Sequence, residues 1–143
     1  MTETHLGFSS ADLARAAAFD RAGRHEQAVD LLRQGAQSGS AAAACALGLR
    51  LLVGHNAPFD PQQGIALLTT AAGQGEPEAL AQMATLKAAG AWMPQNWAEG
   101  LDLLQQAAER GSVRARGQLA VLAGDRALAA RARARTDPRS AAC

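Results

Sequence analysis

Apolar and small residues recur every three or four positions along most of the chain, the spacing that places them on one face of an α-helix. Residues 41–53, for example, place Ala43, Leu47 and Leu51 in line. The same spacing is found in three further segments, residues 61–73, 77–89 and 97–110. The pattern therefore predicts a series of amphipathic helices.

The helical segments belong to a repeat. Three segments rich in small residues each end in a glycine, at Gly39, Gly75 and Gly111. These glycines lie 36 positions apart. In this register the blocks 40–75 and 76–111 match without a gap, with Ala43 on Ala79, Leu47 on Met83, Gly54 on Gly90, Pro58 on Pro94 and Gly64 on Gly100. A fixed period of this length is typical of proteins built from stacked helix pairs.

Turn and capping residues divide each block into two helices. Gly54 and Gly90 end the first helix, because glycine accepts the left-handed conformation that follows a helix C-terminus. Asp60, which precedes a proline, and Asn96 begin the second helix as N-caps. The same reasoning assigns N-caps to the first helices at Ser40 and Ser112.

The two ends of the chain depart from the full repeat. Residues 11–22 and 25–37 predict a shorter N-terminal helix pair. With Phe19, Gly23, Ala28 and Leu32 in place, its residues 23–35 resemble the turn and second helix of a tetratricopeptide unit. The C-terminal part predicts a helix to about residue 124 followed by a separate, weakly apolar helix over 126–135. The expected boundaries are 1–9 and 137–143 for flexible ends, 10–39 for the N-terminal pair, 40–75 and 76–111 for the repeats, and 112–136 for a partial repeat with its capping helix.

Composition favours an all-α fold and excludes several classes of protein. Alanine supplies 36 of the 143 residues and aromatic residues only 3%, which suits helix-on-helix packing and not a β-sandwich. No apolar run is long enough to span a membrane, and we expect no signal peptide. Two cysteines, Cys45 and Cys143, cannot make a disulfide framework, so we expect reduced thiols and a cytoplasmic location.

At these positions the chain resembles the Sel1-like repeat family, a relative of the tetratricopeptide repeat. The resemblance rests on residue types at fixed positions of each unit, which are Ala43, Leu47-Gly48, Gly54, Asp60, Ala71-Ala72 and Gly75 in the first and Ala79, Gly90, Asn96, Ala107-Ala108 and Gly111 in the second. The chain departs from the family pattern at Leu51 and Lys87, where an aromatic residue is usual. It also departs at Asn56 and Trp92, where the loop usually has its second glycine.

The resemblance implies a short right-handed α-solenoid of about seven to eight antiparallel helices. Such pairs stack and expose one extended concave surface, which binds peptide segments or partner helices. The implied role is a non-catalytic scaffold or adaptor with a protein or peptide partner. By period and by analogy with the tetratricopeptide groove, we expect the groove to be lined by Leu49, Leu52, Glu78, Gln82, Thr85, Arg114, Gln118 and Val121.

Residues that could carry catalysis or bind a metal are few and dispersed. His5, His25 and His55 have no second ligand at metal spacing. Cys45 has no histidine partner at a predictable position, so a spectator thiol is favoured over a nucleophile. Gly73-Gln74-Gly75 lacks the strand and the pattern of a phosphate loop, so we interpret it as a helix end. We therefore expect no enzyme activity, cofactor or metal.

The loop AWMPQNW, residues 91–97, is the most distinctive segment. Tryptophan is common in interface hot spots, so Trp92 or Trp97 could contact a partner, whereas the alternative is that Trp92 or Met93 packs over the helix ends. The loop also looks like segments found ahead of prolyl-hydroxylase-like iron/2-oxoglutarate oxygenase domains in some bacterial proteins. A second hypothesis is therefore an accessory or truncated N-terminal module of such an enzyme, inactive alone because the chain lacks a His-x-Asp…His triad.

Charge is distributed unevenly along the chain. Residues 1–109 carry 6 basic and 11 acidic side chains, a net charge of −5, and residues 110–143 carry 8 basic and 2 acidic ones, a net charge of +6. The basic end contains Arg126, Arg131, Arg133, Arg135 and Arg139, but it has no lysine, interleaved aromatic residue or base-reading motif, so nucleic acid is a disfavoured partner. Self-association through the C-terminal helix, with Leu128 in its seam, is a third hypothesis.

Overall fold

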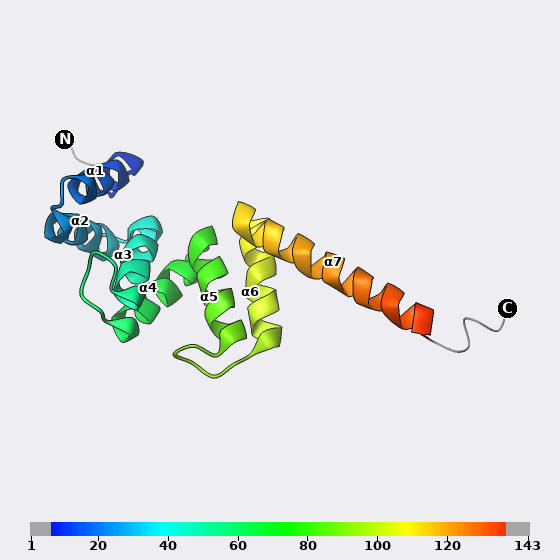
Figure 1. Ribbon diagram of the computed structural model, residues 1–143. Helices are drawn as coiled ribbons and strands as arrows, with labels where there is room; N and C mark the ends of the chain where they lie inside the picture. Colours follow the sequence, from blue (N-terminus) through cyan, green and yellow to red (C-terminus); the bar gives the residue numbers. More distant parts are fainter. Residues whose placement is uncertain (1–6, 137–143) are drawn as a thin grey trace.

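The computed structural model describes residues 7–136, and these form seven α-helices without a strand. The helices are α1 (Ser10–Arg21), α2 (His25–Gln37), α3 (Ala41–Val53), α4 (Pro61–Gly73), α5 (Pro77–Ala89), α6 (Trp97–Glu109) and α7 (Val113–Thr136). They follow one another in space as stacked pairs, from α1 and α2 at one end to α7 at the other (Figure 1). None of these helices is both long and apolar enough to cross a membrane.

The spacing of the helices confirms the repeat. The first helices α3, α5 and α7 begin at residues 41, 77 and 113, and the second helices α4 and α6 begin at residues 61 and 97, so each step is 36 residues. The helices of the two full repeats therefore start at the same positions within the 36-residue blocks found in the sequence, with no insertion between them. The all-α solenoid predicted from the pattern is confirmed.

Side chains cap the N-termini of four helices at the positions predicted from the sequence. The side chains of Asp60 and Asn96 accept hydrogen bonds from backbone amides three residues later at 3.2 and 3.1 Å. The hydroxyls of Ser40 and Ser112 do the same for α3 and α7, each at 3.1 Å. These contacts satisfy amide groups that have no partner within the helix. Gly54 and Gly90 end α3 and α5 with φ of +72° and +71°.

The core consists of alanine and leucine between neighbouring helices. Leu32, Leu47, Leu51 and Leu68 are the largest fully buried side chains, and they join α2, α3 and α4. The backbones of α3 and α4 approach closely, since a Cβ placed on Gly64 would lie 2.8 Å from the carbonyl oxygen of Gly48. Only glycine fits such a contact between two backbones, so the matched glycines set the distance between the helices of this repeat.

A polar cluster attaches the N-terminal helix pair to the first repeat. Arg50 on α3 forms a two-pronged ion pair with Asp20 on α1, one contact of which is 3.0 Å from Nη1 to Oδ1. His25, the first residue of α2, places its Nδ1 2.9 Å from the same Oδ1. Three helices are thus joined at one carboxylate. The hydrogen bonds from Arg50, with a smaller effect from His25, outweigh burial and lower the pKa of Asp20 from 3.8 to about 2.

The C-terminal part differs from the sequence prediction. A single helix, α7, runs for 24 residues from Val113 to Thr136, so the prediction of a separate helix over 126–135 was wrong. Arginine and two alanines occupy positions 126, 130 and 132, where the preceding repeat has the Gly90, Pro94 and Asn96 that break its helices. Alanine and arginine have high helix propensity, so α7 continues through these positions. The side chains of Leu128, Arg133 and Arg135, residue Arg139, and the ends 1–6 and 137–143 lie outside the described part.

We expect Gly64→Ala to destabilise the protein by roughly 1–3 kcal/mol, because the added methyl group would press on the backbone of Gly48 and Leu52. Urea unfolding followed by circular dichroism measures the change. The matched control is Gly117→Ala in α7, where a Cβ meets nothing within 4 Å and the better helix former should add roughly 0.5–1 kcal/mol. Equal stability of Gly64→Ala and the wild type would refute the close contact.

The Asp20 cluster predicts a pH dependence. Since the folded state lowers the pKa of Asp20, the cluster stabilises the fold fully above the unfolded value of 3.8 and loses that contribution as the pH falls toward about 2. Over this interval the free energy of unfolding should fall by roughly 1–2 kcal/mol more in the wild type than in Asp20→Asn. Urea titrations at a series of pH values test this, and parallel curves for the two proteins would argue against it.

Candidate protein-docking cleft

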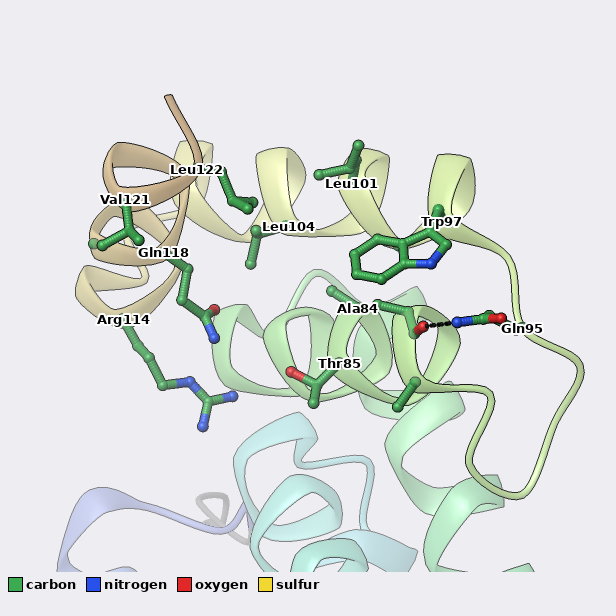
Figure 2. Close-up of a pocket in the computed structure, with 14 residues that line it drawn as sticks. Ala84, Thr85, Gln95, Trp97, Leu101, Leu104, Arg114, Gln118, Val121 and Leu122 are labelled. Carbon is green, nitrogen blue, oxygen red and sulfur yellow. Dashed lines mark hydrogen bonds between the residues drawn. The ribbon is translucent and has the colours of Figure 1, made fainter. Parts of the chain in front are cut away.

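An open cleft lies at the C-terminal end of the solenoid, between α5, α6 and the first half of α7. Its volume is about 840 Å³. One wall is made by Trp97, Leu101 and Leu104 of α6, and the facing wall by Gln118, Val121 and Leu122 of α7 (Figure 2). Small residues of α5, among them Ala84 and Ala88, form the floor.

The cleft exists because the last helix packs less closely than its counterpart one repeat earlier. In the preceding repeat, α5 fits against α3 and α4, and Leu52, Leu68 and Leu86 lie together in a buried cluster. The residues 36 positions later are Ala88, Leu104 and Leu122. Leu86 is 7% exposed whereas Leu122 is 37% exposed. Replacement of a leucine by Ala88, together with the outward course of α7 (Figure 1), leaves this volume open.

The walls of the cleft expose apolar side chains to water. Leu101 is 44% exposed, Val121 is 63% exposed and Trp97 is also exposed. The first turns of α7 are well packed, since Ala115 is fully buried and Leu119 packs against the same cluster as Leu104. The exposed apolar side chains are therefore carried by helices that pack firmly against one another. Exposed apolar surface of this kind is typical of interaction sites.

Polar groups lie between α5 and α7, beside the apolar walls. Arg114 of α7 forms an ion pair with Glu78 of α5 at 3.1 Å. The amide oxygen of Gln82, turned toward Arg114, accepts from both terminal nitrogens of its guanidinium group at 2.9 and 3.0 Å. The Thr85 hydroxyl donates to the carbonyl of its own helix at Ala81, at 3.1 Å. The one charged residue that lines the cleft is thus already paired.

Four of the residues predicted for the groove line the cleft, namely Thr85, Arg114, Gln118 and Val121. Glu78 and Gln82 lie beside it and are joined to it through Arg114. Leu52 was wrongly assigned, because its side chain is 7% exposed and belongs to the core, and Leu49 is half-buried against that core.

Sequence reasoning did not assign Trp97 to this groove, and it did not identify Leu101, Leu104 or Leu122 as groove residues. Leu101 and Leu104 fall on the face of α6 that the helical period assigns to the core. The available signal was the repeat register, which shows alanine at position 88 where the preceding repeat has leucine. When one large side chain of a packed cluster is replaced by alanine in the next repeat and the others stay leucine, unfilled volume is expected beside the alanine.

The loop between α5 and α6 divides its side chains between packing and exposure. Met93 packs against the core, as one of the two alternatives predicted. Trp92 is 60% exposed and lies edge-on to Phe59 of the preceding loop, with ring centroids 6.1 Å apart. Its φ of +63° matches the +55° of Asn56 one repeat earlier, at the position where glycine is usual. A bulky residue in this region of backbone conformation is strained.

The described residues show few features of a metal site or of a reactive thiol. They contain no group of three histidine, cysteine, aspartate or glutamate side chains that could hold a metal ion. Burial, and to a smaller extent Glu76 and Glu78, raise the pKa of the Cys45 thiol to about 12, so the reactive thiolate is suppressed. The cleft itself is suited to contact with an apolar surface.

Comparisons with known proteins agree with this architecture. A Sel1 repeat protein from Oxalobacter formigenes matches 85% of the chain with a TM-score of 0.73 and 22% identity. A protective antigen of uropathogenic Escherichia coli that displays an SLR fold matches 67% of the chain (TM-score 0.60, 25% identity), and Helicobacter pylori cysteine rich protein B matches 64% (TM-score 0.59, 17% identity).

The matches cover 51%, 21% and 69% of those three chains, so this chain spans about half the length of the Oxalobacter protein and a fifth of the E. coli antigen. No family model and no curated protein matches the chain. The 36-residue helix pairs, their caps and the structural neighbours together show that the chain has the fold of the Sel1-like repeat proteins.

Proposed function

We propose that the chain is a non-catalytic protein-interaction module that docks a helical segment of a partner protein in the cleft between α5, α6 and α7. The observation that carries the proposal is the open apolar volume of about 840 Å³ at a place that the preceding repeat fills with its own side chains. The structural neighbours support a helical repeat scaffold for protein interaction.

The shape of the site favours a helix as the occupant. One repeat earlier, the equivalent groove between α3 and α4 receives the helix α5, whose Leu86 is buried there. At the last repeat, α7 fills the groove only over its first turns. The remaining space lies between helices, and such grooves accept an amphipathic helix with its apolar face inward.

The polar residues of the cleft would orient the bound segment. Arg114 is already neutralised by Glu78, so the cleft does not require an acidic partner, and its selectivity would come mainly from apolar contact. Gln118 points into the space between α5 and α7 (Figure 2), where its amide can donate to or accept from a partner. The alternative of an oxygenase accessory module stays a prediction from the loop sequence.

We expect Gly117→Leu to block docking, because residue 117 lines the cleft and its Cβ would point into open space. A photoreactive amino acid at position 118 should crosslink to a partner in lysate of the source organism, and Gly117→Leu should reduce that crosslink roughly tenfold or more.

The matched control is Gly124→Leu, which makes the same change in the same helix where a Cβ also meets nothing but which does not line the cleft. It should retain the crosslink at the wild-type level. Equal loss in both variants, or no crosslink to any protein from position 118, would overturn the cleft as the docking site.

A further inference from the structure

Two shallow grooves that share no residue with the cleft are open beside the second helices of the pairs. One lies between α2 and the loop after α3, and the other between α4, α5 and α6, with volumes of about 520 and 550 Å³. They are equivalent sites of successive repeats, because three pairs of their lining residues lie 36 positions apart. These pairs are Val29 and Ile65, Arg33 and Thr69, and Ala57 and Met93.

An exposed pair of aromatic rings lies between the two grooves. Phe59 follows Pro58, which lines the first groove, and Trp92 precedes Met93, which lines the second. The rings meet edge to face with centroids 6.1 Å apart, and the two residues are 62% and 60% exposed. Phe59 packs on Gly54, where an added Cβ would lie 3.1 Å from the Cβ of Phe59. The rings therefore support each other while both stay open to water.

The grooves on either side of the rings are acidic. Four exposed carboxylates line them, namely Glu26, Asp30, Glu99 and Asp102. Two positive side chains also line them, of which Lys87 pairs with Glu99 at 2.9 Å. Four acidic and two basic side chains give a net charge of −2, with the histidine of the first groove counted as neutral. The other three carboxylates form no ion pair with a described side chain.

We propose that this surface, the two grooves with the aromatic pair between them, binds an extended, proline-rich segment of a partner protein that carries arginine or lysine. It is called the aromatic strip below. The inference goes beyond the proposed function, since it adds a second binding surface to the same chain. Proline rings pack on Phe59 and Trp92, and the cationic side chains pair with the carboxylates of the grooves, so apolar contact and charge select the same segment.

The shape of the aromatic strip favours an extended occupant over a helix or a strand. The exposed rings lie between the grooves, and they would hold a straight helix, about 10 Å across, away from both. A bound strand needs the free edge of a sheet, and residues 7–136 contain no strand. A polyproline II segment needs no backbone partner and is already extended, so it loses little conformational entropy when it binds aromatic side chains.

Fluorescence anisotropy of a labelled peptide, titrated with the full chain, tests the proposal. The probe contains three repeats of arginine-proline-proline, which place the arginines on one ridge of a polyproline II helix. At about 0.15 M salt we expect a Kd of roughly 10–300 µM. Two control peptides have glutamate in place of arginine, or glycine and serine in place of the prolines. Each should bind roughly tenfold more weakly or worse.

Two variants locate the contact. Trp92→Gly removes one ring and places glycine at a φ of +63°, which glycine adopts freely, so the helical circular dichroism should be unchanged while the affinity falls roughly tenfold. Asp102→Lys should weaken binding roughly threefold to tenfold. The matched control Asp125→Lys makes the same change of charge at an exposed residue of α7 outside the aromatic strip, and it should bind within about twofold of the wild type.

Three results would each overturn the proposal. They are an absence of binding at about 1 mM chain, equal binding of the glycine-serine peptide, and undiminished binding to a folded Trp92→Gly chain. The proposed function is tested separately, because the aromatic strip shares no residue with the cleft and Trp92→Gly should retain the crosslink from position 118. Loss of that crosslink in the folded variant would show that the two surfaces are one site.

Discussion

The close approach of two helices within each repeat is the contact on which the remaining packing depends. Gly48 meets Gly64 in the first repeat, and Ala84 meets Gly100 in the second, so the backbones of paired helices lie against one another with little or no side chain between them. This short distance sets the width of the groove that each pair offers to the next helix. A core of alanine and leucine is sufficient because the backbones themselves fill much of the volume.

The cleft between α5, α6 and α7 is a consequence of that same arrangement in the second repeat. A helix pair held this close still presents a groove, and a further helix has to fill it. The first repeat receives α5 with Leu86 buried, whereas the second receives α7 with Leu122 partly exposed over Ala88. Solenoids bury a continuous core only between neighbours, so an incompletely packed last helix leaves its groove available to another chain.

The sequence predicted the 36-residue spacing of the helices because its signals are local. The caps at Asp60 and Asn96 and the left-handed glycines Gly54 and Gly90 act within one helical turn, and each was found at its expected position. The course of α7 was mispredicted because the repeat register predicts another helix pair, whereas the arginine and the two alanines at positions 126, 130 and 132 replace the residues that break the preceding helices.

For the site, the helical period predicted which side of the first helices faces the groove, and of the predicted residues Thr85, Arg114, Gln118 and Val121 line the cleft. The period could not distinguish Leu52, which is buried, from the predicted residues that line the cleft. Whether a residue on that face is buried or lines a cleft depends on how closely the next helix packs. The sequence by itself determined the helices up to the start of α7 and their 36-residue spacing, since these follow from local conformational preferences. Only the tertiary structure decided where the array stops packing, because burial is a property of neighbouring elements and not of the residue that is buried.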